Sequence, residues 1–152
     1  MKRYLTERVK RAGRFLCFLL SVFVIFFTLG CHSEVSSITI KISHLLYPHY
    51  NQTVKVKMYE RFQLSDTDLL AAVVEFVPDF AIDTLTKKVI SLSPELRNPA
   101  FKIYVQKQNQ KREEVWAFFK VLVPHFTPQT GLIFEILEFK YKGETYRRGE
   151  SR

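Results

Sequence analysis

The sequence contains little cysteine, and its two cysteines, Cys17 and Cys31, both lie within the first 31 residues. Beyond residue 31 the chain has no thiol, which excludes disulfides and zinc sites built on paired cysteines from that part of the protein. The fold of that part must therefore be stabilised by side-chain packing and not by covalent cross-links.

Glycine is also scarce, at five of 152 residues. The sequence has no Gly-rich loop of the kind that cradles phosphate, and no Gly-x-Ser-x-Gly segment of a hydrolase nucleophile. The four histidines, His32, His44, His49 and His125, lack the His-Glu-x-x-His spacing of zinc enzymes. We therefore expect no cofactor and no metal, and we expect a protein that is not an enzyme.

The formal net charge of +8 is unevenly distributed along the chain. Residues 1–30 hold six basic residues and one acidic residue, which leaves 17 basic and 14 acidic residues from position 31 onward. A nearly neutral body does not favour nucleic acid as a partner. The remaining excess lies at the C-terminus, where we expect residues 143–152 to form a solvated basic tail.

Basic residues precede an apolar run at the N-terminus. All six basic residues of this region lie in residues 2–14, and residues 15–29 come next without a charge. A helix of that length is about 22 Å long, which is shorter than the roughly 30 Å hydrocarbon core of a bilayer. The pattern is typical of a signal peptide, and positive charge before the apolar run directs the rest of the chain out of the cytoplasm.

The apolar run ends in Thr28-Leu29-Gly30-Cys31, which resembles the lipobox of bacterial lipoprotein signal peptides. Gly30 supplies the small residue before the cleaved bond, and Cys31 supplies the thiol that takes a lipid. The alternative is an uncleaved signal anchor in which Cys31 is an ordinary cysteine. Either interpretation makes residues 1–30 a signal or anchor, makes membrane lipid a partner, and predicts an extracytoplasmic location in a bacterial cell envelope.

A period of two dominates the sequence between residues 31 and 142, where apolar and polar residues alternate as they do in half-buried strands. The strands predicted from this pattern and from further apolar segments cover residues 38–43, 54–59, 101–106, 115–123 and 132–141. Short strands separated by Pro and Asn turns predict a single, mainly β domain over residues 31–142, folded as a small antiparallel sandwich or barrel.

One segment is ambiguous between helix and strand. Ser65 is followed three residues later by an acid, which imitates a helix N-cap. Because β-branched and aromatic residues concentrate toward Val77, we predict a strand over residues 70–77 that ends at Pro78.

Four short motifs lie between residues 77 and 118. They are Val77-Pro78-Asp79-Phe80, Ser91 with Ser93, Asn98-Pro99-Ala100, and Trp116-Ala117-Phe118. Together they resemble a family of small exported bacterial proteins defined by a domain of unknown function, over roughly residues 52–140. A weaker resemblance is to extracytoplasmic β-rich segments of ResB-type cytochrome c biogenesis proteins. The resemblance implies an architecture and a location, not an activity.

The motifs supply five candidate structural or partner-contact residues: Asp79, Phe80, Asn98, Pro99 and Trp116. Asp79 follows a proline and Asn98 precedes one, so each is placed to satisfy backbone groups of a turn. Trp116 lies on a predicted central strand, and we expect it to be an anchor of the core.

The leading functional hypothesis is a non-enzymatic, membrane-tethered domain that binds a protein partner in the cell envelope. The alternatives are an extracytoplasmic hydrolase that uses Asp79 or His125, and a purely structural surface lipoprotein. A cavity lined by Asp79, Asn98 and His125 favours the hydrolase, whereas an exposed apolar patch or an unpaired strand edge favours binding.

Overall fold

The computed structural model describes residues 34–107, 111–120 and 130–150, which belong to one compact unit that begins at Glu34. Its strands are β1 (Val35–His44), β2 (Asn51–Val56), β3 (Arg61–Gln63), β4 (Leu69–Val77), β5 (Phe80–Ile82), β6 (Val89–Ser91), β7 (Ala100–Lys107), β8 (Glu113–Phe118), β9 (Leu132–Tyr141) and β10 (Glu144–Arg147). Within these ranges no helix has the length and apolar character needed to cross a membrane.

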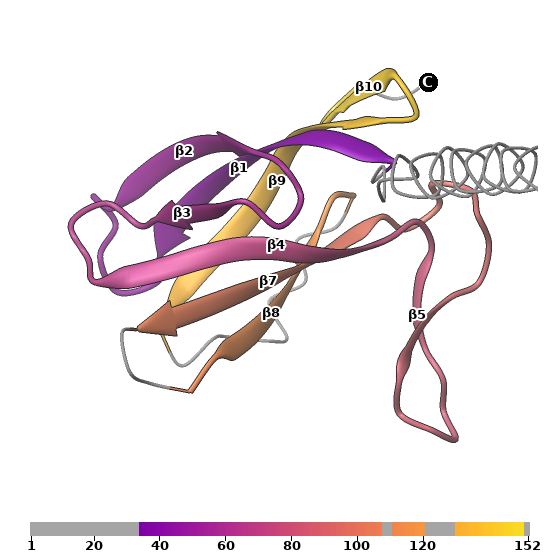
Figure 1. Cartoon of the computed structure of the whole chain (residues 1–152), viewed down its shortest axis with the longest axis horizontal. Coiled ribbons are helices and arrows are strands. Elements are labelled where there is room, and N and C mark those ends of the chain that lie inside the picture. Colours follow the sequence, from indigo (N-terminus) through magenta and orange to yellow (C-terminus); the bar gives the residue numbers. More distant parts are fainter. Residues whose placement is uncertain (1–33, 108–110, 121–129, 151–152) are drawn as a thin grey trace, which may run out of the picture. The chain divides into compact units, whose positions relative to one another are not determined.

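The strands form two four-stranded antiparallel sheets and a separate hairpin (Figure 1). The first sheet has the order β10-β9-β1-β2, and the second has the order β3-β4-β7-β8. Strands β5 and β6 pair only with each other and extend beyond the two sheets. The prediction of a mainly β domain is confirmed.

The ambiguous segment after Ser65 is a turn followed by a strand, as predicted. Asp66 adopts a left-handed backbone conformation with φ of 57°, and both the amide and the hydroxyl of Thr67 donate to the carbonyl of Leu64. These bonds close a tight turn in place of a helix cap, and β4 then runs from Leu69 to Val77.

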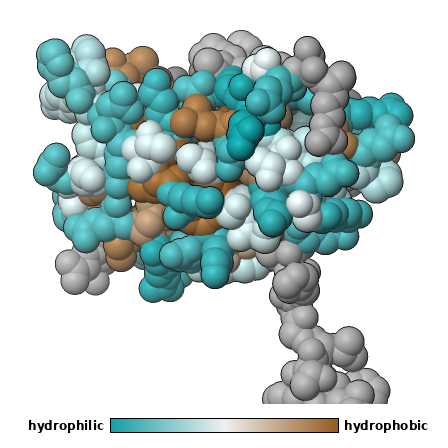
Figure 2. Space-filling model, turned by 90° about the horizontal axis from the view of Figure 1, so that it is seen from above, coloured by the Kyte–Doolittle hydropathy of each residue, from teal (hydrophilic) through white to brown (hydrophobic). Residues whose placement is uncertain are grey.

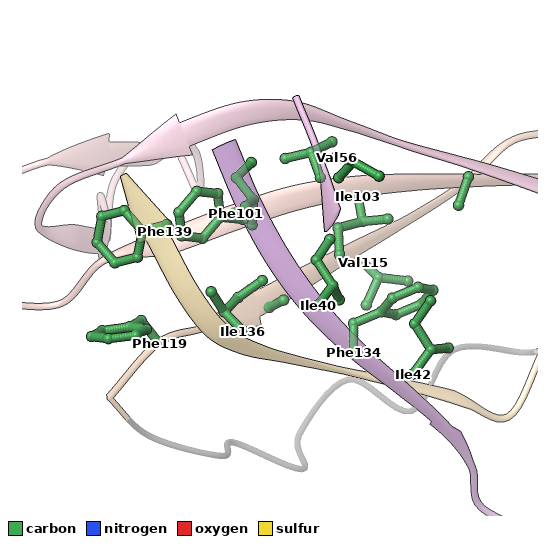
Figure 3. Packing of buried hydrophobic residues seen from close by; sticks show 14 of the residues in the cluster. Ile40, Ile42, Val56, Phe101, Ile103, Val115, Phe119, Phe134, Ile136 and Phe139 are labelled. Atoms are coloured by element: carbon green, nitrogen blue, oxygen red, sulfur yellow. The ribbon is translucent and has the colours of Figure 1, made fainter. Parts of the chain in front are cut away.

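The alternating pattern buries one face of each sheet against the other. Figure 3 shows side chains from β1 and β9 pointing toward side chains from β7 and β8. Phe101 of β7 and Phe139 of β9 are almost fully buried, and their rings meet edge to face with centroids 5.2 Å apart. Aliphatic and aromatic side chains, Tyr141 among them, form this shared core, so apolar packing joins the two sheets.

The C-terminal region differs from the expected solvated tail, because residues 144–147 form β10 on the edge of the first sheet. Lys142 and Gly143 both have positive φ, at 49° and 87°, and make the two-residue turn that suits an antiparallel hairpin. Tyr146 then stacks on Phe139 at 5.2 Å, and Arg147 pairs with Glu138 at 2.8 Å. The Lys-Gly turn and these two contacts place residues 144–147 in the first sheet. Their charge alone had suggested a solvated tail.

Candidate functional site

The five candidate residues lie together at the base of the β5–β6 hairpin. Asp79 and Asn98 form an isolated parallel bridge, and the Phe80 ring meets the Trp116 ring edge to face at 5.0 Å. Pro99 is fully buried beside them. The structure thus brings into one region residues that are up to 37 positions apart in the sequence.

Asn98 holds the hairpin in place through both its side chain and its backbone. Its side-chain amide donates to the carbonyl of Phe80 at 3.2 Å, and its own carbonyl accepts the amide of Phe80 at 3.0 Å. Two bonds to a single residue fix the position at which β5 begins. The expected turn-closing role of Asn98 therefore has a specific partner.

Asp79 acts differently from the expectation, because its backbone and not its carboxylate makes the turn bonds. Its carbonyl accepts the amide of Leu92 at 3.0 Å, and its amide donates to the hydroxyl of Ser91 at 3.3 Å. The side chain is buried, and no hydrogen bond joins its carboxylate to another described residue. Its charge reaches Arg97, whose pKa is raised first by the hydrogen bond to Glu95 and to a smaller degree by Asp79.

The prediction that Trp116 anchors the core is wrong, since Trp116 lies on the outer face of the second sheet. Its neighbours Val115 and Ala117 point into the core, so the alternation of a strand turns Trp116 the other way. There it is half-buried between Phe80 and the ammonium group of Lys102, which lies 5.0 Å from the ring centroid. Trp116 is the platform on which the hairpin rests.

A second aromatic contact and an ion pair complete this platform. The Phe118 ring lies 4.8 Å from the Phe80 ring, on the same face of β8 as Trp116. The Lys102 ammonium pairs with Glu75 at 2.7 Å, and this hydrogen bond is the first cause of a raised pKa for Lys102. The surface that contacts the hairpin therefore has an apolar part, formed by the Trp116 and Phe118 rings, and a charged part, formed by Lys102 and Glu75.

Beyond its base the hairpin exposes aliphatic side chains. Leu85 at the tip is 91% exposed, and Leu92 after β6 is 68% exposed. Ile82 and Ile90, one on each strand, are also exposed. The pairing of Ile82 with Val89 and of Ala81 with Ile90 places these two isoleucines on opposite faces of the hairpin, so the hairpin exposes apolar side chains on both faces and at its tip.

A separate exposed group, which we call the distal patch, consists of Leu45, Leu46 and Tyr47 between β1 and β2. The loop is well fixed, because the Leu46 amide donates to Nδ1 of His44 and the Leu45 amide donates to the carbonyl of Gly131. Hydrophobic residues, drawn in brown, also show between hydrophilic ones on the face drawn in Figure 2. The apolar residues of this domain are therefore not confined to its interior.

A cleft of about 560 Å³ lies between the segment before β7, the end of β8 and β10. Phe119, Phe139 and Tyr146 contribute aromatic surface to it. Its two arginines are already neutralised, since Arg147 pairs with Glu138 at 2.8 Å and Arg148 with Glu135 at 3.1 Å. The third basic residue of its lining is Lys120, which is exposed and has no ion pair with a described residue.

The described residues show only part of the geometry expected of a hydrolase. Asp79 and Asn98 are adjacent, but neither lines any of three clefts found among the described residues. Across residues 34–107, 111–120 and 130–150, no three His, Cys, Asp or Glu side chains are grouped closely enough to hold a metal ion. The predictions for Gly30, Cys31 and His125 lie outside the described residues.

No protein-family model matches the chain, and neither a curated protein nor a solved structure matches it significantly.

Proposed function

We propose that the chain is a bacterial lipoprotein held to a membrane through Cys31, and that its β domain binds a partner protein outside the cytoplasm. The membrane tether rests on the basic N-terminus, the uncharged run over residues 15–29 and the Gly30-Cys31 junction. We further propose that the two sheets form a sandwich and not a barrel, because each has two edge strands and the sheets meet through side chains.

The distal patch is the observation that carries the binding function. Leu46 is 75% exposed and Tyr47 65% exposed, although the loop is held by hydrogen bonds at both ends. An ordered loop that presents an aromatic and two aliphatic side chains to water has the composition of an interface core. Because the loop is already fixed, a partner binds it with little loss of conformational freedom.

The position of the patch fits a tethered protein. The patch follows the last residue of β1, whereas the chain enters the domain at the first. A strand of ten residues separates these points by about 30 Å. The patch therefore lies at the end of the domain away from the proposed membrane anchor, where a protein partner has access.

Photo-cross-linking in intact cells tests the binding function. A cross-linker at Leu46 should yield a discrete adduct with another protein, and one at Lys140 should not, because Lys140 is exposed on the polar face of β9. Adducts only between copies of this chain would replace the partner by self-association. Absence of any adduct at Leu46 would favour the structural lipoprotein.

The tether is tested separately at Cys31. Cys31→Ala should abolish incorporation of labelled fatty acid and leave an unprocessed precursor. If the wild-type chain takes up no label and migrates at full length, the uncleaved signal anchor is correct.

A further inference from the structure

We propose that the β5–β6 hairpin inserts its tip into the surface of the anionic lipid bilayer to which the chain is tethered. This inference rests on the membrane attachment proposed above, and it adds a second contact between the domain and the lipid. Four observations on the hairpin support it, concerning its apolar tip, its order, its charge and its place in the domain.

The tip presents aliphatic side chains and no aromatic ones. Leu85 is 91% exposed, and Ile82 and Ile90 are exposed on the two strands behind it. A protein interface of this size normally gains its affinity from aromatic or arginine anchors that fill pockets. Aliphatic groups on a narrow projection instead suit the non-specific apolar boundary beneath lipid headgroups.

The tip is ordered by its own hydrogen bonds, so Leu85 is held outward. The Asp83 carboxylate accepts the amide of Leu85 at 2.9 Å and the hydroxyl of Thr86 at 2.7 Å. The amide of Lys87, which has φ of 58°, donates to the Asp83 carbonyl, and the Asp83 amide donates to the carbonyl of Lys88. A preformed tip enters the headgroup region without first having to fold.

Two lysines stand directly behind the apolar tip. Lys87 and Lys88 are exposed, and no ion pair joins either of them to an acidic group in the part of the chain that the structure describes. The acidic group nearest in sequence is Asp83, whose oxygens are occupied by the bonds of the tip. Apolar residues followed by free ammonium groups complement a layer of acyl chains covered by anionic headgroups.

The hairpin leaves the domain at the end where the chain enters it. Val35 pairs with Tyr141, and the Tyr141 ring lies 5.2 Å from the ring of Phe76, near the end of β4. Only three residues then separate Phe76 from the first strand of the hairpin. In Figure 1 the start of β1 and the hairpin accordingly lie at the same end of the two sheets.

The short segment between Cys31 and Val35 limits how far the start of β1 can lie from the proposed lipid anchor. Four peptide steps join Cys31 to Val35, and a fully extended chain covers about 14 Å in four steps. A lipid on Cys31 therefore holds the first residue of β1 within about 14 Å of the lipid-bearing residue, which is roughly twice the depth of one headgroup layer. The apolar tip is then presented to the bilayer surface, whereas the distal patch is not.

The test uses the full chain reconstituted into vesicles, with an environment-sensitive thiol dye at one position. The dye is placed at Leu85→Cys, or at Leu46→Cys in the distal patch as a matched exposed control, in a Cys17→Ser background. The parent chain without an added cysteine reports on the tether, because Cys31 resists the dye only if its thiol carries lipid. If Cys31 reacts, the same measurement is made with Cys31→Ser, since an uncleaved anchor also holds the domain at the bilayer.

In vesicles that mix phosphatidylglycerol with phosphatidylcholine, the dye at residue 85 should shift to the blue and be quenched by acyl-chain nitroxides. The dye at residue 46 should remain open to aqueous iodide. Replacing Lys87 and Lys88 by Gln should lower the ratio of inserted to free tip about five-fold per lysine, the effect of one basic residue at an anionic surface.

Two results would overturn the proposal. In the first, residue 85 is as open to iodide as residue 46 in both anionic and purely zwitterionic vesicles, although the chain floats with the lipid. In the second, residue 85 is protected in native membranes but not in pure lipid, which would assign the hairpin to a protein. Failure of the chain to float, or labelling of Cys31, would count against the tether alone.

Discussion

Removal of the Phe80 ring should detach the β5–β6 hairpin while leaving the two sheets folded. The hairpin pairs with no strand of either sheet, so its base is fixed by the Asn98 hydrogen bonds and by the contact of Phe80 with Trp116 and Phe118. A two-stranded hairpin is marginally stable by itself in water. In Phe80→Ala the hairpin should therefore open locally, well below the free energy of global unfolding.

The size of the effect follows from the two ring contacts. The Phe80 ring meets Trp116 at 5.0 Å and Phe118 at 4.8 Å, both edge to face. Each such pair contributes about 0.5–1.5 kcal/mol beyond the burial of its area. A loss of about 2 kcal/mol corresponds to an increase of roughly 30-fold in the open population of the hairpin.

Trp116 is the only tryptophan of the chain, so its fluorescence reports on this contact directly. In Phe80→Ala its emission should shift to the red, and the amides of β5 and β6 should exchange about 30-fold faster, whereas those of β1 and β9 keep their protection. Leu85→Ala is the control within the same hairpin, since Leu85 is almost fully exposed. Unchanged emission, or equal acceleration of exchange in every strand, would refute this account of how the hairpin is held.

Three further changes test other parts of the domain. Asn98→Ala removes the side-chain donor to the first residue of β5 and should cost about 1 kcal/mol of unfolding free energy in urea titrations, whereas an unchanged midpoint would contradict the assigned bond. The pKa of Asp83 is lowered first by the hydrogen bond from Thr86. The stability that the Asp83 carboxylate gives the tip is therefore present above about pH 4 and is lost as the pH falls through the lowered pKa. Below that lowered pKa the tip amides should lose protection from exchange in the wild type but not in Asp83→Asn. Gly131→Ala should lower the melting temperature, because φ of 69° disfavours any side chain and the new Cβ would lie 2.9 Å from the His44 ring. A variant as stable as the wild type would show that the loop adjusts freely.

The strands were predictable where burial follows a strict period. Residues 38–43 alternate because one face of β1 meets the core and the other does not, so the sequence predicts this part of the sheet directly. The short strands β3, β5 and β6 have three residues each, which is too few for a period to show. Strand β10 was not predicted because its segment contains basic residues, and the charge pattern does not reveal that Arg147 lies opposite a glutamate.

The candidate residues lie close together, but their geometry could not be predicted from the sequence. The motifs containing Asp79, Asn98 and Trp116 do converge, yet the face on which Trp116 lies depends on the register of β8 against β7. A shift of one residue would reverse that face, and no local signal in the sequence fixes it. The exposure of Leu85 could not be predicted either, since the sequence around an aliphatic loop residue is the same whether its side chain is buried or exposed.

The proposed contact of the hairpin with lipid is too weak to hold the domain on a membrane without the proposed tether, and this limits the role of the hairpin. Burying Leu85 contributes about 2 kcal/mol, and two lysines at an anionic surface add about 2 kcal/mol more. A total near 4 kcal/mol corresponds to a dissociation constant of about 1 mM, which is similar to the effective concentration that a short flexible linker provides. Insertion of the tip is therefore close to balance, so the anionic lipid content of the membrane sets the fraction of molecules that have two contacts with it. In the proposed arrangement, the second contact fixes the orientation of the domain so that the distal patch faces away from the bilayer.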